Sequence, residues 1–148
     1  MSDRIEKRIV LRAPRARVWR ALAVADELGA WFGVEFAPGS RLAVGACLTA
    51  KVLHPGYEHL PFRITIERLE PERVLAWRWV PHAEPGYSPD EPTTLVEFTL
   101  ADADGGTLLT IIESGFDRVP PARRLLAFRA NEGGWAVQVE NIKKHVEA

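Results

Sequence analysis

The 148-residue chain has little of what several protein classes require. Its single cysteine, Cys47, cannot form an internal disulfide and cannot by itself hold an iron–sulfur cluster or a cysteine-rich zinc site. Long apolar runs are missing too, since no segment approaches ~18 uninterrupted apolar residues and the charged beginning lacks the apolar stretch of a signal peptide. These absences predict a cytoplasmic protein with no membrane insertion.

Charge of one sign is not in excess either. The sequence has 19 Lys and Arg residues against 20 Asp and Glu residues, a formal net charge of -1. Basic residues outnumber acidic ones in positions 1–20, but they alternate with apolar residues and are not interleaved with an aromatic platform for base stacking. We therefore expect no nucleic-acid partner.

Motifs for the common cofactor sites are absent as well. The sequence contains no phosphate-binding loop, no dinucleotide-binding glycine motif, no nucleophile elbow and no H-E-x-x-H pair. The four histidines are spread along the chain without the spacing of metal ligands. We expect no cofactor and no metal ion.

What the sequence does have is the composition of one globular domain over residues 1–148. It is 47% hydrophobic and 26% charged, and no repeat, low-complexity tract or linker divides it. The longest polar interruption, at 81–94, predicts a long loop that we expect to act as a lid.

Apolar and polar residues alternate with a period of two over much of the chain, which predicts an antiparallel sheet. We expect strands at 5–11, 34–37, 41–44, 47–53, 62–69 and 73–80, and then a hairpin of 94–100 and 107–114 that turns at 104–106. On the last strand, Glu113 continues the row formed by Thr107, Leu109 and Ile111.

Helical spacing appears in three places. Pro14 starts a short amphipathic helix, a second helical turn covers 26–30, and a long helix of about 26 residues covers 122–146. The pair Gly133-Gly134 predicts a bend or a close backbone approach within the long helix. A long helix packed across a bent antiparallel sheet is an α+β arrangement that encloses a cavity.

Five segments occur in the order and spacing of a known family: APRARVWRAL at 13–22, AWFG at 30–33, PERVLAWRW at 71–79, GGTLLTIIESGF at 105–116 and NEGGW at 131–135. With them the chain resembles the activator of Hsp90 ATPase homologue family, in the START/Bet v 1-like (SRPBCC) superfamily of helix-grip domains. The resemblance covers essentially the whole chain. It implies a curved sheet of about seven antiparallel strands around the C-terminal helix, with two short helices after the first strand.

The resemblance implies a pocket but no single activity, because superfamily members bind lipids, hormones or polyketides, and some are cyclases or dehydratases. A eukaryotic branch stimulates a chaperone ATPase, which would place the protein in the stress response. The chain has no room for the additional N-terminal domain of those co-chaperones, so a chaperone contact is disfavoured. Some bacterial look-alikes are labelled vanillate demethylase reductase, a role that one cysteine and no flavin motif exclude.

Two residues are candidates for acid–base chemistry. Glu113 places a carboxylate on an apolar strand face, which is costly unless the group is paired or functional. His54 lies in the segment HPGYEHLP, which in a helix-grip fold reaches the mouth of the cavity. The alternatives are a strand-end residue that reaches solvent or pairs with an arginine for Glu113, and a polar surface turn for His54.

The sequence also supplies many aromatic and branched side chains for a pocket that holds a small, largely hydrophobic molecule. The candidate ligand-binding residues are Trp31, Phe36, Trp77, Trp79, Phe98, Leu109, Ile111, Glu113, Phe128, Arg129 and Trp135. Ordinary core packing is the alternative for each aromatic residue. Glu113 or Arg129 would orient a polar group of the ligand.

The leading hypothesis is therefore a ligand-binding domain. The alternatives are a cyclase- or hydratase-type enzyme that uses Glu113 or His54, and a co-chaperone-like protein-interaction module. A homodimer is left open.

Overall fold

A computed structural model describes residues 3–148. The first half holds β1 (Arg4–Leu11), α1 (Arg15–Ala23), α2 (Ala25–Phe32), β2 (Val34–Phe36), β3 (Cys47–Val52) and β4 (Pro61–Glu70). The second half holds β5 (Val74–Trp79), β6 (Thr94–Ala103), β7 (Gly106–Ser114), a short 3-10 turn η1 (Phe116–Arg118) and α3 (Pro121–Glu147). The element types and their order confirm the predicted α+β helix-grip fold.

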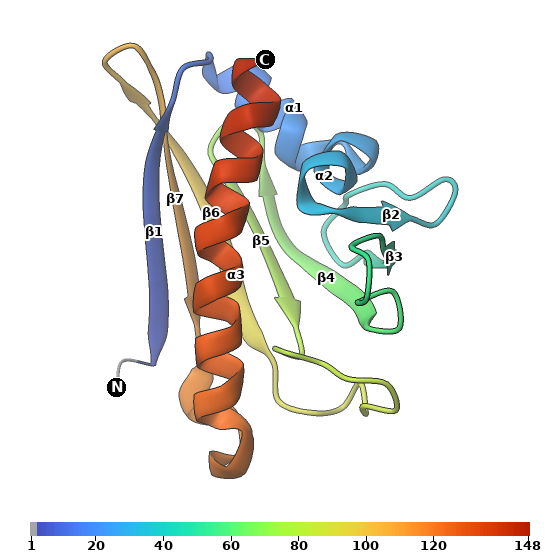
Figure 1. The fold of residues 1–148 in the computed structure, drawn as a ribbon. Helices are drawn as coiled ribbons and strands as arrows, with labels where there is room; N and C mark the ends of the chain where they lie inside the picture. Colours follow the sequence, from blue (N-terminus) through green and yellow to red (C-terminus); the bar gives the residue numbers. More distant parts are fainter. Residues whose placement is uncertain (1–2) are drawn as a thin grey trace.

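The seven strands form one antiparallel sheet in the order β1-β7-β6-β5-β4-β3-β2. Figure 1 shows α3 lying across one face of this sheet, with α1 beside the C-terminal part of α3 and α2 next to β2. Strands β2 to β7 follow one another as a meander, and β1 closes the far edge by pairing with β7.

Period-two alternation along the strands decides which residues enter the core. Ile5 and Leu11 of β1 are buried, and so are Ile64 and Ile66 of β4. On β6 the buried positions are every second residue from Thr94 to Leu100. These rows face α3 because a half-buried antiparallel strand presents alternate side chains to the core.

The strand predicted at 41–44 is wrong. These residues belong to the loop between β2 and β3, and the Val44 side chain is 68% exposed. Gly45 has φ of +86°, and its N–H donates to the carbonyl oxygen of Ile66 at 2.8 Å, so this segment turns back toward β4. Four alternating residues between Gly39 and Gly45 are too few to form a strand against the turns on either side.

Of the two alternatives predicted at Gly133-Gly134, a bend or a close backbone approach, the close approach is wrong. Helix α3 continues through both residues, and a Cβ atom added to either would meet no atom within 4 Å. Both glycines are exposed, so no neighbouring backbone takes up the space that their missing side chains leave.

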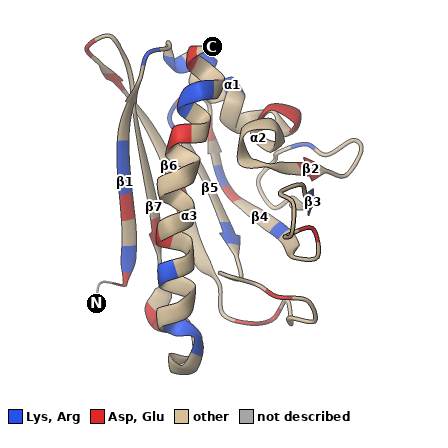
Figure 2. Cartoon of the chain, viewed as in Figure 1, with Lys and Arg blue, Asp and Glu red and all other residues tan. Residues whose placement is uncertain are grey.

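Charged residues of both signs are interspersed along β1, β4 and α3 (Figure 2). Within residues 3–148, no helix is both long and apolar enough to cross a membrane.

Glu27 of α2 joins the three α-helices. Its Oε1 accepts from Arg17 at 2.7 Å and contacts His145 Nε2 at 3.0 Å, and its Oε2 accepts from Arg20 at 2.8 Å. Partial burial raises the pKa of Glu27, but the hydrogen bonds from His145, Arg17 and Arg20 together outweigh burial and hold the pKa below its usual value.

We expect Glu27→Gln to lower the melting temperature most at neutral pH. A depressed folded-state pKa stabilises the fold above the unfolded-state pKa, and this contribution disappears as the pH falls through the lower folded-state value. Melting curves from about pH 7 to about pH 3 should therefore show the wild-type advantage shrinking below about pH 4.5. Glu140→Gln, on the exposed side of α3, is the control, and a wild-type advantage that is constant with pH would contradict the prediction.

Candidate ligand cavity

The carboxylate of Glu113 is fully buried and is held by four side chains. Its Oε1 accepts from Trp135 Nε1 at 2.8 Å and from Asn131 Nδ2 at 3.0 Å. Its Oε2 accepts from Trp79 Nε1 at 2.8 Å, from Thr94 Oγ1 at 2.6 Å and from the same Asn131 amide at 3.0 Å. One side chain of β7 therefore connects β5, β6 and α3.

Strand register and helix periodicity bring these groups together. Trp79, the last residue of β5, pairs with Thr94, the first residue of β6, and Val96 pairs with Glu113. Asn131 and Trp135 are four residues apart on α3, so both project from the same helix face. The row of inward-facing β7 residues that ends in Glu113 therefore contacts the face of α3 that packs on the sheet.

Among residues 3–148, no Lys, Arg or His forms an ion pair with Glu113. All of its partners are neutral, and the indole and amide N–H groups of three of them can only donate. The carboxylate oxygens are therefore occupied by donors, while the negative charge has no neighbouring cation.

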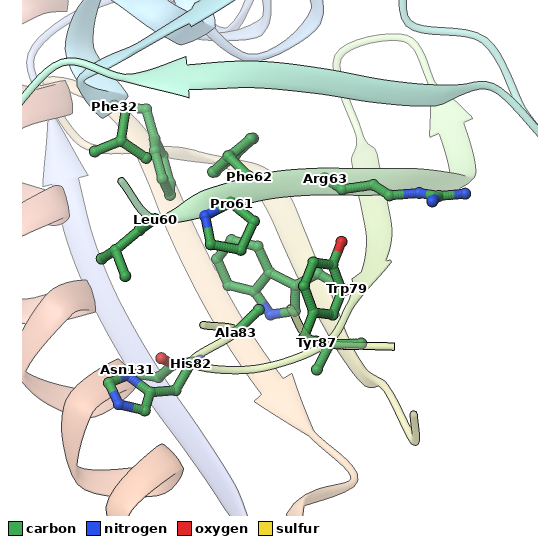
Figure 3. A pocket seen from close by; sticks show the side chains of 12 residues that line it. Phe32, Leu60, Pro61, Phe62, Arg63, Trp79, His82, Ala83, Tyr87 and Asn131 are labelled. Atoms are coloured by element: carbon green, nitrogen blue, oxygen red, sulfur yellow. The ribbon is translucent and has the colours of Figure 1, made fainter. Parts of the chain in front are cut away.

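A cavity of about 220 Å³ lies beside this cluster. Figure 3 shows side chains of β4, β5, the loop after β5 and α3 converging on it, while the Arg63 side chain extends away from the others. Its lining residues are Phe32, Val52, Leu60, Pro61, Phe62, Arg63, Trp79, Val80, His82, Ala83, Tyr87 and Asn131. We call it the larger cavity.

A second cavity of about 160 Å³, the smaller cavity, shares Phe32, Trp79 and Asn131 with the first. It reaches α3, where Ala130, Gly134, Trp135 and Gln138 complete the lining. The rings of Phe32 and Trp79 are 6.3 Å apart between centroids, and those of Phe32 and Trp135 are 5.8 Å apart. Because the two cavities have three residues in common, a change in these side chains affects both.

Arg123 of α3 fastens the loop between β5 and β6 over the larger cavity. One guanidinium nitrogen pairs with Glu91 at 3.0 Å, and the other donates to the carbonyl oxygens of Pro81 at 3.0 Å and His82 at 3.4 Å. The loop supplies four of the lining residues, among them Ala83 and Tyr87. The predicted loop at 81–94 therefore forms a wall of the cavity.

The structure distributes the predicted site residues over three environments. Trp79 and Trp135 line the smaller cavity, and Glu113 lies behind them as their hydrogen-bond acceptor. The residues that pack in the core are Trp31, Phe36, Trp77, Phe98, Leu109, Ile111 and Phe128. Arg129 is exposed on α3, and His54 is exposed on the loop after β3, where its ring contacts Tyr57.

The middle of the sheet–helix interface, expected to be hollow, is filled. The rings of Trp77 and Phe98 are 4.8 Å apart between centroids, and those of Phe98 and Trp135 are 5.7 Å apart. Rings at these distances are in van der Waals contact, so they leave little room for a ligand between them. Space remains beside this filled centre, in the larger cavity toward β4 and the loop after β5 and in the smaller cavity against α3.

Sequence reasoning missed Phe32, Phe62 and Asn131 as cavity residues. A signal was available for Phe62, which alternates with Ile64 and Ile66 on the inner face of β4. Asn131 lies in the segment NEGGW, four residues before Trp135, so helical spacing alone places its amide next to that indole.

The sheet, the long helix and the cavities between them define a helix-grip domain. The chain belongs to the activator of Hsp90 ATPase homolog 1-like protein family, whose model matches residues 12–147. A comparison with curated protein sequences finds no significant match.

Solved structures share the fold at low sequence identity. Protein Ms6760 from Mycobacterium smegmatis superimposes with a TM-score of 0.77 at 17% identity, over 96% of this chain and 89% of its own. The Aha1 dimer from Colwellia psychrerythraea superimposes with a TM-score of 0.73 at 19% identity, over 99% of this chain and 97% of its own. DynU16, a putative protein in the dynemicin biosynthetic locus, superimposes with a TM-score of 0.76 at 22% identity, over all of this chain but only 48% of its own length.

Proposed function

We propose that the protein binds a small, largely apolar molecule in the two adjoining cavities between the sheet and α3. The observation that carries the proposal is the lining itself. Phe32, Phe62, Trp79 and Trp135 present aromatic rings there, and the amide of Asn131 is held in place by Glu113. Apolar walls with a few fixed polar groups are typical of ligand sites.

The cavity volumes set the size of the ligand. Neither the larger cavity, about 220 Å³, nor the smaller one, about 160 Å³, reaches the ~300 Å³ at which drug-sized sites begin, but the two together do. A compact molecule fits one cavity, and a longer one requires Phe32 or Trp79 to move. Phe32 is the freer of the two, because it is half-buried and its ring makes no hydrogen bond, whereas moving Trp79 would break its hydrogen bond to Glu113.

The geometry favours binding over proton transfer. Glu113 is absent from the lining of both cavities and accepts hydrogen bonds at both oxygens, so we assign it the role of positioning Trp79, Trp135 and Asn131. His54 is not among its partners. The placement of DynU16 in a biosynthetic locus agrees with a small-molecule ligand, whereas a homodimer and a cytoplasmic location stay predictions for this chain.

A thermal-shift screen of compact apolar and aromatic molecules tests the proposal. A ligand at about a hundred times its Kd should stabilise the protein by about 2.7 kcal/mol, which a melting curve readily detects. Ala83→Phe would fill the larger cavity, so we expect it to abolish the shift for ligands that bind there.

Ala136→Phe, on the exposed side of α3 and outside both linings, is the matched control and should keep the shift. If no molecule in a broad screen stabilised the wild-type protein, the proposal would be wrong.

A further inference from the structure

The smaller cavity combines aromatic walls with a buried charge behind them. Phe32, Trp79 and Trp135 supply three rings, and no Lys, Arg or His is among its lining residues. Trp79 and Trp135 both donate their indole N–H to Glu113, at 2.8 Å each. Three lining residues, Trp79, Asn131 and Trp135, thus hydrogen-bond to the carboxylate.

N–H donors face both oxygens of Glu113, an arrangement that suits the carboxylate form, and no cation stands beside it within residues 3–148. Its partners are two indoles, one amide and one hydroxyl, and within residues 3–148 it forms no ion pair. In the low-dielectric interior, a charge acts over longer distances than in water. The cavity wall therefore lies in a negative potential.

The aromatic rings act in the same direction. The face of an indole ring carries the negative side of its quadrupole and attracts cations, Trp most strongly. A carboxylate that accepts the indole N–H adds electron density to the ring. Two of the three rings here are polarised in this way by one carboxylate.

The polar lining of the smaller cavity also suits a cation. Because Asn131 Nδ2 donates to both oxygens of Glu113, its Oδ1 is fixed on the opposite side of the amide, and no donor among residues 3–148 bonds to it. Gln138, the other polar lining residue, uses its amide nitrogen on the carbonyl oxygen of Phe32 at 2.8 Å. The free hydrogen-bonding group of Asn131 is an acceptor.

We propose that the smaller cavity selects compact organic cations, such as alkyl- or quaternary ammonium groups, over neutral and anionic molecules of the same shape. The inference rests on the proposed function and adds that the ligand carries a positive charge. The apolar body of such a ligand occupies the cavity, and its positive charge faces the rings of Trp79 and Trp135. The larger cavity, which Arg63 and His82 help to line, takes no part in this selection.

Three probes of nearly equal shape test the inference with the full chain: choline, the neutral 3,3-dimethylbutan-1-ol and the anionic 3,3-dimethylbutanoate. Affinity is measured by isothermal titration and by tryptophan fluorescence. We expect choline to bind on the order of tenfold more tightly than the alcohol, and the carboxylate to bind more weakly than both.

Binding of the alcohol as tight as that of choline would overturn the inference and leave the proposed function intact. Failure of all three probes would overturn the inference as well, and the ligand screen described above then decides separately on the proposed function.

A variant outside the Glu113 cluster locates the effect without disturbing the core. Ala130→Leu places three further carbon atoms at the lining of the smaller cavity, and we expect it to remove most of the choline affinity. Ala136→Leu adds the same atoms on the exposed side of α3 and should leave the affinity unchanged. Equal choline binding by Ala130→Leu and the wild type would contradict the assigned site.

Discussion

Replacement of Glu113 by alanine is expected to lower the free energy of unfolding by about 3 kcal/mol or more. The substitution leaves the indole N–H of Trp79 and Trp135 and the amide of Asn131 without an acceptor. Each buried donor that loses its partner costs about 1–3 kcal/mol, and these costs are not simply additive. The alanine substitution also opens space in a closely packed core.

Glu113→Gln removes the carboxylate but keeps nearly the same side-chain volume, so it tests the charge separately from the packing. The glutamine has nearly the same shape, but its amide would point N–H groups at donors on one side of the cluster, so we expect it to be destabilising as well. Urea unfolding measures both variants, with Glu132→Gln on the exposed side of α3 as a control that should stay within about 0.5 kcal/mol of the wild type. Wild-type stability of Glu113→Ala would show that the cluster does not hold α3 to the sheet.

Gly106→Ala is expected to be comparably damaging, for a steric reason. A Cβ atom at Gly106 would lie 1.9 Å from the carbonyl oxygen of Leu11 and 3.1 Å from the Cα of Arg12. These are backbone atoms at the end of β1, where Thr107 Oγ1 also donates to the carbonyl oxygen of Ala13 at 2.7 Å. Neither strand can yield without breaking this corner, so we expect a loss of about 3 kcal/mol in urea unfolding.

Gly133→Ala makes the matched comparison within the same chain. The added methyl group meets no atom within 4 Å, and alanine favours the helix interior by about 1 kcal/mol over glycine. One glycine-to-alanine change should therefore destabilise the protein while the other stabilises it. Equal effects of the two substitutions would show that the close approach at Gly106 is relieved without cost.

Local patterns in the sequence carried much of the fold. The period-two rows of β4, β6 and β7 and the helical spacing of α3 were each readable within one segment, and the parity of Glu113 with Ile111 correctly indicated a buried carboxylate. The strand expected at 41–44 failed because so short an alternation has no advantage over the turns that flank it.

The composition of the Glu113 cluster could not be read in the same way. Its partners Asn131, Trp135 and Trp79 are 18, 22 and 34 positions away in the sequence. The pairing of β5, β6 and β7 brings Trp79 to Glu113, and the rotation of α3 against the sheet selects Asn131 and Trp135. The same holds for the cavities, whose position depends on which rings fill the centre. Trp77 and Phe98 fill it, and Phe32 and Phe62, on the side of β4, leave space.

The open sheet has two free edges, and both are unsuited to recruiting a further strand. The edge strand β1 carries Glu6, Lys7 and Arg8 in succession, and at the other edge β2 is only three residues long with Glu35 in its middle. Charged side chains and short edge strands oppose the backbone pairing through which sheets from separate molecules join. Both edges of this open sheet therefore carry features that oppose edge-to-edge aggregation.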